Sequence, residues 1–399
     1  RFIHRREIIM ASFDLHNANL KDKKVIIRVD FNVPLDEEGN ISDTTRVDQA
    51  LPTLKLILEK NPKKLVIMSH LGRPKGETNQ KYSLEPVAKY LAETLSEDVT
   101  LTESCLDSGI KTMLGLSTNK IILLQNLRFH KEEESNDPDF SRSLASYGDI
   151  YVNDAFGTAH RKHASTYGIV SHFKNRSYFG LLMDKEIKAL SKIIDAPKKP
   201  FVAIMGGAKV SDKIKIIERL LPVVDKLLIG GAMAYPFLKS KGEEIGKSLC
   251  SDEDVKLAKT LLIDKLSNKI MIPSDHIVAK DPESTASNVT RIPQDQMALD
   301  IGPKTREAFE NEISKASTIL WNGPMGLFEK EAFSEGTLHV AEALSESNAY
   351  TLVGGGDSVS ALKKSGLSDK VSHVSTGGGA SLKFLEEGSL VGISAIKFN

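Results

Sequence analysis

The chain has 399 residues, with 53 Lys plus Arg against 53 Asp plus Glu, so it has no net pull toward nucleic acid or membrane surfaces, and any cationic site has to be concentrated locally. Its two cysteines argue against a disulfide scaffold and fit a reducing compartment. No apolar run reaches transmembrane length, and a chain this long exceeds one ordinary core, so we expect two domains.

The opening residues 1–9 are basic and come before Met10, where Met-Ala-Ser resembles a natural start. We expect residues 1–9 to be an extension, either upstream translated sequence or a cloning remnant, and exclude them from the fold prediction. A very short transit peptide is the alternative.

The first predicted strand lies at the beginning of the segment 24–34 and ends in polar groups. Its β-branched residues predict a buried strand, and Pro34 stops the pattern. Asp30 and Asn32 then lie at its carboxyl end, where parallel α/β sheets bind ligands. These two side chains suit a hydroxylated small molecule, although a strand followed by a polar turn explains them equally well.

Three later strands of the first half also end in cations. These predicted strands are 64–69, 120–124 and 150–153. If they lie beside the first strand, their basic residues meet on one rim, which consists of Arg46, His70, Arg73, Arg128, Arg161 and His163. A single surface arginine is usually a solvated charge, but repeated placement at strand ends favours a phosphate site, since guanidinium groups bind phosphate in a bidentate manner.

A helix is predicted between the two halves of the chain. Apolar residues recur at helical spacing in the segment 183–194. The Pro-containing segment 195–200 ends the pattern, and a new strand begins at Phe201. The simplest arrangement is a helix that joins two α/β lobes.

Four predicted strands of the second half lead into glycines and then into a helix. They are 201–205, 227–229, 351–353 and 373–375. Glycine allows backbone N–H groups to approach an anion, and a helix N-terminus adds a favourable dipole. One such loop is explained by a tight turn, but four of them near Lys213 and Asp357 predict nucleotide phosphates and a metal ion.

Two helices of the second half have clear start signals. Ser251 and Asp254 have the spacing of a capping box. Pro303 follows Gly302 and suits a first helical turn. We therefore expect helices to begin at both places.

Three other motifs fail on spacing or context. The segment 242–248 resembles a Walker A loop but has one residue too few between its glycines. No dinucleotide fingerprint occurs, because Val359 stands where the third glycine is needed. His160 and His163 have a spacing that suits zinc, but the basic residues between them favour an anion.

Seven long strings in the chain carry a resemblance to a known family. They include RVDFNVP, SHLGRPKG and WNGPMGLFE, and they lie at 28–34, 69–76, 153–160, 207–213, 321–329, 354–358 and 375–380. Together they resemble the phosphoglycerate kinases, from about Met10 to the carboxyl terminus. Strings of this length are more specific than any single glycine loop.

The resemblance implies an α/β fold of two Rossmann-like lobes, each a parallel sheet covered by helices, joined by an interdomain helix. It implies a 3-phosphoglycerate-binding domain at 10–182 and an interdomain helix and hinge at 183–200. A nucleotide-binding domain at 201–389 follows, and the tail 390–399 returns to the first domain. A cytoplasmic monomer is implied as well.

The resemblance also implies the reaction. This is reversible phosphoryl transfer between 1,3-bisphosphoglycerate and ADP, giving 3-phosphoglycerate and ATP, by direct in-line transfer on cleft closure. Magnesium accompanies the nucleotide, and the implied metal residue is Asp357. The implied catalytic residues are Arg46, Lys213 and Gly378.

The remaining implied roles concern binding. The residues implied for the substrate are Asp30, Phe31, Asn32, Arg46, His70, Leu71, Gly72, Arg73, Arg128, Arg161 and His163. Those implied for the nucleotide are Gly207, Lys209, Lys213, Gly231, Leu299, Asn322, Pro324, Leu327, Glu329, Gly355, Gly356, Asp357 and Ser358.

Two positions depart from the family pattern. Ala298 stands where the family often has Gly beside the adenine, and its methyl group would narrow that edge slightly. Lys383 stands where an acidic residue is common. We expect Lys383 on the solvent face of a helix, away from catalysis.

Two other classes of function compete with a kinase. A Rossmann dehydrogenase is disfavoured by the missing fingerprint and by the lysines at the glycine loops. A catalytically inactive binding protein would be marked by loss of Arg46, Lys213 or Asp357, and all three are present.

Overall fold

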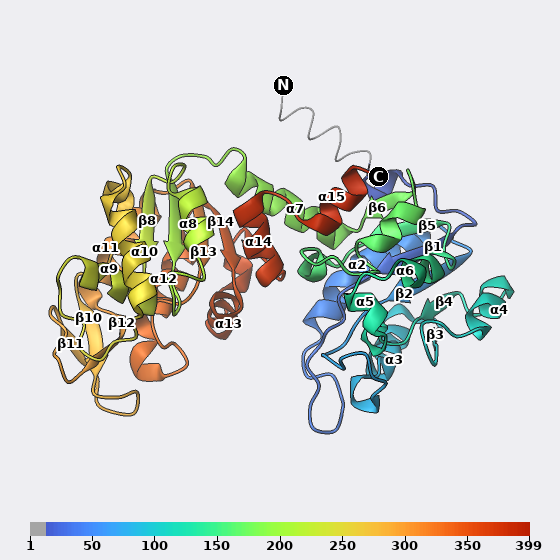
Figure 1. Ribbon diagram of the computed structural model, residues 1–399, viewed down its shortest axis with the longest axis horizontal. Helices are drawn as coiled ribbons and strands as arrows, with labels where there is room; N and C mark the ends of the chain where they lie inside the picture. Colours follow the sequence, from blue (N-terminus) through green and yellow to red (C-terminus); the bar gives the residue numbers. More distant parts are fainter. Residues whose placement is uncertain (1–12) are drawn as a thin grey trace. The chain divides into compact units, whose positions relative to one another are not determined.

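The structure is a computed structural model that describes residues 13–399. The chain forms two compact units (Figure 1). Unit 1 runs to Lys188 and includes Ser389–Asn399, and unit 2 is Ala189–Gly388. The extension expected at residues 1–9 lies outside the described residues.

Unit 1 is built on a six-stranded sheet in the order β3-β4-β2-β1-β5-β6, and all its neighbouring strands are parallel. The apolar residues of β1 are fully buried in succession, as expected for a parallel strand covered on both faces. Because the strands are parallel, their carboxyl ends share one edge. The strands are β1 (Lys24–Arg28), β2 (Lys64–Met68), β3 (Val99–Leu101), β4 (Ile121–Leu123), β5 (Ile150–Asn153) and β6 (Ser177–Phe179).

Helices cover this sheet, and the end of the chain joins it. In the tail, Gly392 N donates to Ala159 O at 2.9 Å, which ties α15 to the loop after β5. The α-helices of unit 1 are α2 (Thr45–Glu59), α3 (Glu85–Leu95), α4 (Gly109–Gly115), α5 (Lys131–Glu134), α6 (Pro138–Ala145) and α15 (Val391–Lys397). Its 3-10 helices are η1 (Leu15–Asn17), η2 (Gln80–Tyr82), η3 (Leu127–Phe129), η4 (Phe156–Thr158) and η5 (Gly168–His172).

Helix α7 (Leu181–Ile194) confirms the predicted helix between the halves, although it begins two residues earlier than the apolar pattern suggested. The reason is a cap from another element. Asp154, just after β5, accepts the N–H groups of Leu182 and Met183 at 2.9 and 3.1 Å. A side chain thus satisfies orphan donors of the first turn.

Unit 2 is built on a second parallel sheet, in the order β15-β14-β13-β7-β8-β9. The four strands predicted before glycines are confirmed as β7, β8, β14 and β15. Trp321, which is fully buried in β13, donates from Nε1 to Gly323 O at 2.8 Å and so fixes the turn after its strand. The strands are β7 (Phe201–Met205), β8 (Lys226–Ile229), β9 (Ile270–Met271), β13 (Thr318–Asn322), β14 (Tyr350–Gly354) and β15 (His373–Val374).

Unit 2 also contains a small antiparallel sheet that the sequence patterns did not predict. It consists of β10 (His276–Ala279), β11 (Ser287–Val289) and β12 (Met297–Ile301), in the order β11-β10-β12. The sheet has its own apolar cluster, in which Val278 and Ala298 pack with residues of α9. Strands this short carry too little alternation to stand out in the sequence.

The helices of unit 2 begin where the capping signals predicted. Ser251 Oγ accepts the N–H of Asp254 at 3.1 Å, and Pro303 is the first residue of its helix. The α-helices are α8 (Ile214–Leu220), α9 (Tyr235–Ser240), α10 (Asp252–Ile263), α11 (Pro303–Lys315), α12 (Glu335–Glu346), α13 (Gly356–Lys364) and α14 (Gly379–Glu387). The 3-10 helices are η6 (Ala232–Ala234), η7 (Ser267–Lys269), η8 (Glu331–Phe333) and η9 (Ser368–Lys370). Within residues 13–399, no helix has both the length and the apolar character needed to cross a membrane.

Candidate active site

The predicted cations of the first half do come from neighbouring strand ends. β4, β2, β1 and β5 are adjacent in the sheet, and the loops or helices that follow them carry basic residues. We call this group the cationic rim. It consists of Arg46, His70, Arg73, Arg128, Arg161 and His163.

Asp30 and Asn32 organise this rim from the end of β1. Arg46 Nη1, on α2, donates to Asp30 Oδ2 at 2.7 Å. Asn32 Oδ1 accepts the N–H of Gly72 at 2.8 Å, which binds the loop after β2 to the loop after β1. The polar residues after β1 therefore hold a cation and a neighbouring loop in place.

Arg128 lies deeper than the other arginines of the rim, with a side chain only 5% exposed. Its Nη1 donates to Gly72 O at 3.0 Å, while Nε lies 3.6 Å from Glu134 Oε1. Gly72 has φ of +62°, and a Cβ there would come within 2.4 Å of the Tyr82 ring. Only glycine fits this contact point between β2 and β4.

Other predicted substrate residues divide by exposure. Arg73 and Arg161 are exposed, so their guanidinium groups are accessible to an anion. The side chains of Phe31 and Leu71, by contrast, are buried in the core of unit 1. These side chains pack in the core below the loops. Only the backbone groups of Phe31 and Leu71 are therefore candidates for ligand contact.

Arg28 is a residue at this site to which the sequence patterns assigned no role. It is the last residue of β1 and is fully buried. Its Nε donates to Ser165 Oγ at 2.8 Å, and its Nη2 lies 3.1 Å from His70 Nδ1. The signal was a charged residue at the end of an otherwise apolar strand.

The two histidines of the rim are held neutral. Burial, assisted by the nearby Arg28, Arg128 and Arg161, lowers the pKa of His163 to about 3. The pKa of His70 is also well below its usual value, first because of burial and then because of the neighbouring arginines. The positive charge of the rim at neutral pH therefore comes from its arginines.

Glycines of unit 2 bring three backbone segments together, the loops after β7, β8 and β13, but not all of them offer free N–H groups. Gly206 N donates to Asn322 O at 2.9 Å, and Gly207 N donates to Pro324 O at 3.1 Å. Gly231 N likewise donates to Met325 O at 2.9 Å. The expectation that these loops present their amides to phosphate is wrong at these positions, because neighbouring carbonyl groups already accept them.

These glycines serve close packing instead. A Cβ on Gly231 would lie 2.7 Å from Gly207 N and 2.8 Å from Pro324 O, and its φ is +65°. Gly323, with φ of +100°, would place a Cβ 2.5 Å from Lys213 Nζ. The absence of side chains allows the loops after β7, β8 and β13 to meet around one lysine.

Lys213 is a half-buried cation of unit 2. Its Nζ donates to Gly206 O at 2.6 Å and to Asn322 O at 3.0 Å. Burial lowers its pKa to about 8, although Asp357 and Asp212 oppose that shift. Lys209, in the same loop, is exposed.

Two helices of unit 2 begin directly after glycines with positive φ. α13 begins at Gly356 after Gly355, which has φ of +89°, and α14 begins after Gly378, which has φ of +53°. The first N–H groups of a helix have no partner within it, so those at the start of α13 suit an anion. In α14, the N–H of Ala380 already donates to Gly377 O at 3.0 Å. Ser358 is buried, and its Oγ accepts the N–H of Gly323 at 2.6 Å.

The residues predicted for the nucleotide base and ribose lie in β12, at the end of β13 and in the loop after β13. Leu327 N donates to Leu299 O at 2.8 Å, which joins the loop after β13 to β12. Pro324 is buried, whereas Glu329 is exposed. The departure at Ala298 is buried in β12, where its N–H donates to Ser248 Oγ at 2.9 Å.

Lys383, the other departure, forms ion pairs on its own helix. Its Nζ lies 3.7 Å from Glu386 and 2.7 Å from Glu387. These partners are one turn further along α14, and the Lys383 side chain is partly exposed. It therefore stabilises the helix surface, in agreement with the expected location.

The fit of a magnesium ion depends on Asp357. In the described part of the chain, no cluster of three or more His, Cys, Asp or Glu side chains suits a metal ion. Asp357 is exposed in the first turn of α13. A single carboxylate fits magnesium that arrives with a nucleotide, because this ion is usually held by one or two carboxylates and substrate phosphates.

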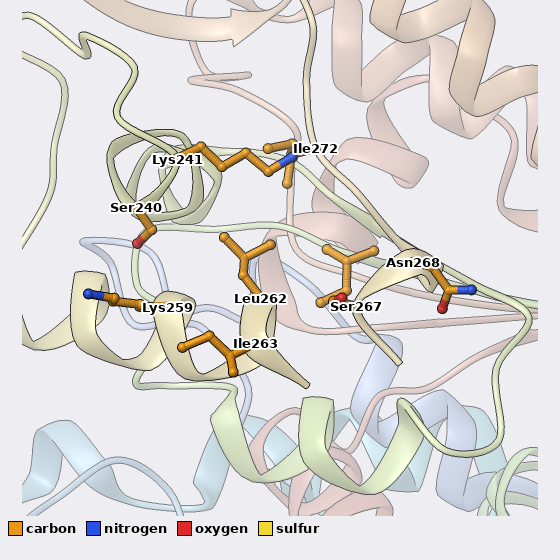
Figure 2. Close-up of a pocket in the computed structure, with 9 residues that line it drawn as sticks. Ser240, Lys241, Lys259, Leu262, Ile263, Ser267, Asn268 and Ile272 are labelled. Atoms are coloured by element: carbon orange, nitrogen blue, oxygen red, sulfur yellow. The ribbon is translucent and has the colours of Figure 1, made fainter. Parts of the chain in front are cut away.

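A separate cavity of about 430 Å³ lies in unit 2 (Figure 2). Lys259, Leu262 and Ile263 of α10 line it, together with residues from the end of α9 and from η7 to β9. None of its lining residues belongs to the predicted site. Ser240 Oγ already donates to Pro236 O at 2.7 Å, so we assign no ligand to this cavity.

Comparisons with known proteins agree on one family. The family model described as phosphoglycerate kinase matches residues 15–388. A phosphoglycerate kinase of Acidobacterium capsulatum is 51% identical over 404 residues, covering 97% of this chain and 99% of the relative. One of Pelodictyon phaeoclathratiforme is 49% identical over 400 residues, covering 97% and 100%.

Solved structures give the same answer for the fold. The phosphoglycerate kinase of Coxiella burnetii superposes with a TM-score of 0.87 at 39% identity, covering 96% of this chain and 97% of that one. The phosphoglycerate kinase of Pyrococcus horikoshii superposes with a TM-score of 0.81 at 32% identity, covering 96% and 98%. The predicted fold class and family resemblance are confirmed, and the chain belongs to the phosphoglycerate kinase family.

Proposed function

We propose that this chain is a kinase that transfers a phosphoryl group reversibly between 1,3-bisphosphoglycerate and ADP, giving 3-phosphoglycerate and ATP. Membership of the family over residues 15–388 supports the reaction. The structural observation that supports this reaction is that the two candidate binding sites belong to different units. The cationic rim belongs to unit 1, and the glycine loops with Lys213 belong to unit 2.

The substrate role falls to the cationic rim. Arg46, Arg73 and Arg161 offer guanidinium groups for phosphate and carboxylate, and Arg128 adds a buried charge at the base. Asp30, already paired with Arg46, limits the excess positive charge and is an acceptor for a substrate hydroxyl group.

The nucleotide role falls to the loops of unit 2. The first turn of α13 suits a phosphate, and Lys213 and Lys209 add positive charge. Asn322 and Leu327 would line the base and ribose, with Glu329 as the acceptor for ribose hydroxyl groups. Gly207 and Gly231 shape the loops through close packing, as their amides are already bonded.

Magnesium would be held by Asp357 together with the nucleotide phosphates. When bound, the ion neutralises phosphate charge. Asp357 lies in the first turn of α13, the helix start assigned to phosphate, and it also contributes to keeping Lys213 protonated. The chain's own contribution is therefore the Asp357 carboxylate and the half-buried Lys213 ammonium group.

The mechanism requires no protein nucleophile. Phosphoryl transfer depends mainly on positioning and on charge neutralisation around the transferring group. We assign the stabilising contacts to the Arg46 guanidinium, the Lys213 ammonium and the N–H groups at Gly378. Because substrate and nucleotide residues belong to different units, the units must bring their ligands together for direct in-line transfer, and water must be excluded from the acyl phosphate.

An assay of the full chain with 3-phosphoglycerate, ATP and magnesium tests this proposal. Formation of 1,3-bisphosphoglycerate is coupled to NADH oxidation by a dehydrogenase. We expect turnover with 3-phosphoglycerate and none with glycerate, which lacks the phosphate that the rim recognises. Absence of turnover in a folded protein that binds both ligands would favour the inactive binding protein.

We further propose a monomer in the cytoplasm. Cys105 and Cys250 are both free, which fits a reducing compartment. Light scattering coupled to size exclusion tests the monomer, and a dimeric mass would contradict it.

A further inference from the structure

The contacts of His70 define which ring nitrogen carries its proton. Its Nδ1 lies 3.1 Å from Nη2 of Arg28. A guanidinium group has only donors, so Nδ1 has to be the unprotonated acceptor, and the proton of the neutral ring is on Nε2. The competing contact from Nδ1 to Asp30 Oδ1 is 3.9 Å long, beyond hydrogen-bond range.

Two buried residues, Ser165 and Glu133, hold the Arg28 side chain in place through hydrogen bonds. Its Nε donates to Ser165 Oγ at 2.8 Å. The same hydroxyl group donates to Glu133 Oε1 at 2.5 Å, and the Ser165 N–H donates to Glu133 Oε2 at 3.0 Å. Glu133 is fully buried, and its two carboxyl oxygens accept these bonds. Burial raises the pKa of Glu133, and Arg28 and Ser165 oppose that shift.

The hydrogen bonds in this chain of groups therefore have a single consistent direction. Ser165 donates to Glu133, Arg28 donates to Ser165, and Arg28 also donates to His70. The last group is left with one free donor, Nε2–H, which has no hydrogen-bond partner within residues 13–399. A donor without a protein partner on the cationic rim is available to a ligand.

We propose that Glu133, Ser165 and Arg28 are positioning residues that hold His70 as a neutral imidazole with its proton on Nε2. His70 then meets the substrate anion as a directed hydrogen-bond donor, while the arginines of the rim supply the charge. The nature of that anion rests on the proposed function, but the tautomer does not.

The charges around His70 support a neutral ring. Arg28 of β1, Arg128 of η3, Arg46 of α2 and His163 of the loop after β5 all lower its pKa, after the larger effect of burial. Asp30 is the acid that faces it, and Arg46 already occupies that carboxylate at 2.7 Å. The surroundings of His70 therefore hold its pKa well below the usual histidine value and favour the neutral ring.

Nitrogen NMR of the full chain tests the tautomer without substrate. In protein labelled with ¹⁵N-histidine, two-bond ¹H–¹⁵N correlations assign the protonated nitrogen of each ring. We expect His70 to show Nε2–H and an acceptor Nδ1 between about pH 5.5 and 8, the range in which ordinary histidines titrate. A proton on Nδ1, or ordinary titration near neutrality, would overturn the proposal.

Ser165→Ala tests the positioning residues, because it breaks the link to Glu133 and keeps the charge of Arg28. We expect a mixture of His70 tautomers, together with a KM for 3-phosphoglycerate raised about tenfold, the cost of one misdirected bond to a charged ligand. We expect kcat to stay within about twofold. Ser171→Ala, at an exposed serine of η5, is the control and should change neither property.

An unchanged tautomer and an unchanged KM in Ser165→Ala would refute the positioning role. If that variant fails to fold, His70→Gln and His70→Lys give an independent test. Glutamine retains an acceptor for Arg28 and a donor for substrate, so its KM should stay within about fivefold, whereas lysine should bind worse. Equal binding by His70→Lys would refute the neutral-donor role. Absence of turnover in every variant and in the wild type would refute the proposed function while the NMR result stands.

Discussion

Single charged side chains set the chemistry at the residue scale, and Arg46 is the most informative of them. It lies in the first turn of α2 and donates to Asp30 at the end of β1. It is also partly exposed, unlike Arg128, so its guanidinium group is free to change partner. These features suit an arginine that exchanges its contact with Asp30 for one with the transferring phosphoryl group and stabilises the charge on that group.

Arg46→Ala should lower kcat by roughly 10³–10⁵, the range known for catalytic arginines in phosphoryl transfer, while KM for 3-phosphoglycerate rises modestly. Arg46→Lys should rescue only in part, because an ammonium group lacks the planar fork. Steady-state kinetics at saturating substrates measure both effects.

The matched control is Arg73→Ala, which removes an exposed arginine of the same rim. It should mainly weaken substrate binding, by about 1–3 kcal/mol. Wild-type kcat in Arg46→Ala would show that Arg46 only binds substrate.

Asp154 gives a second prediction, on pH and stability. Burial raises its pKa to about 7, although Thr53 and the N–H groups of Met183 and Leu182 oppose the shift. A carboxyl whose folded pKa lies above its unfolded value takes up protons on folding, so the protein loses stability as pH rises from about 4 toward 7.

Asp154→Asn should therefore raise the unfolding temperature more at pH 8 than at pH 5. The stability gain at pH 8 should be up to about 4 kcal/mol, as the pKa shift from 3.8 to about 7 spans about three units of about 1.4 kcal/mol each. Differential scanning calorimetry at both pH values measures it, with the exposed Asp139→Asn as control. A lower unfolding temperature at pH 8 would show that the charged cap outweighs its burial.

At the scale of elements, strand ends and helix starts position the site. The parallel registers place the ends of β1, β2, β4 and β5 on one edge, and the loops after β7, β8 and β13 meet around Lys213. The backbones of these loops are in such close contact that a side chain at the glycine positions would clash. Glycine is therefore required there for steric reasons.

Gly231→Ala should disturb the nucleotide loops specifically. Its methyl group would meet backbone atoms at 2.7 and 2.8 Å, in addition to the cost of φ at +65°. We expect KM for ATP to rise at least tenfold, which corresponds to about 1.4 kcal/mol of lost ATP binding. KM for 3-phosphoglycerate should stay nearly unchanged.

Gly242→Ala is its control, because Gly242 has φ of +84° but no atom within 4 Å of the place that a methyl group would occupy. It should cost only the conformational strain, about 1–2 kcal/mol of stability, and leave both KM values unchanged. Equal effects of the two variants on ATP binding would show that strain, rather than the backbone contact, matters.

At the scale of the whole molecule, the two units carry different ligand chemistries on one chain. α7 connects them, and the carboxyl-terminal α15 belongs to unit 1. The chain therefore crosses between units twice, once in α7 and once near Ser389. Any movement of one unit against the other has to be absorbed at these two crossings.

Small-angle X-ray scattering tests this movement. With 3-phosphoglycerate and magnesium ADP together, which do not react, we expect a smaller radius of gyration than with either ligand alone. Ligand-dependent closure is the usual way to exclude water during transfer. An identical radius in all states would contradict the hinge.

Much of the fold followed from the sequence, because the local signals were strong. Apolar runs at 24–29 and 201–205 predict buried strands, and the stripe at 183–194 predicts α7. The strings shared with the family also identified it correctly. The roles assigned to individual site residues stay predictions until the variants are measured.

What the sequence determined by itself was the main strands that end at the site, the helix between the two halves and the family. Only the tertiary structure decided the partners of the buried polar groups. Arg28 and Ser165 are 137 residues apart, and the amides of Gly206 and Gly207 are accepted by carbonyls at the end of β13 and in the loop after it. Periodicity and capping are encoded within a few residues, whereas a hydrogen bond between distant segments depends on how the sheet aligns them.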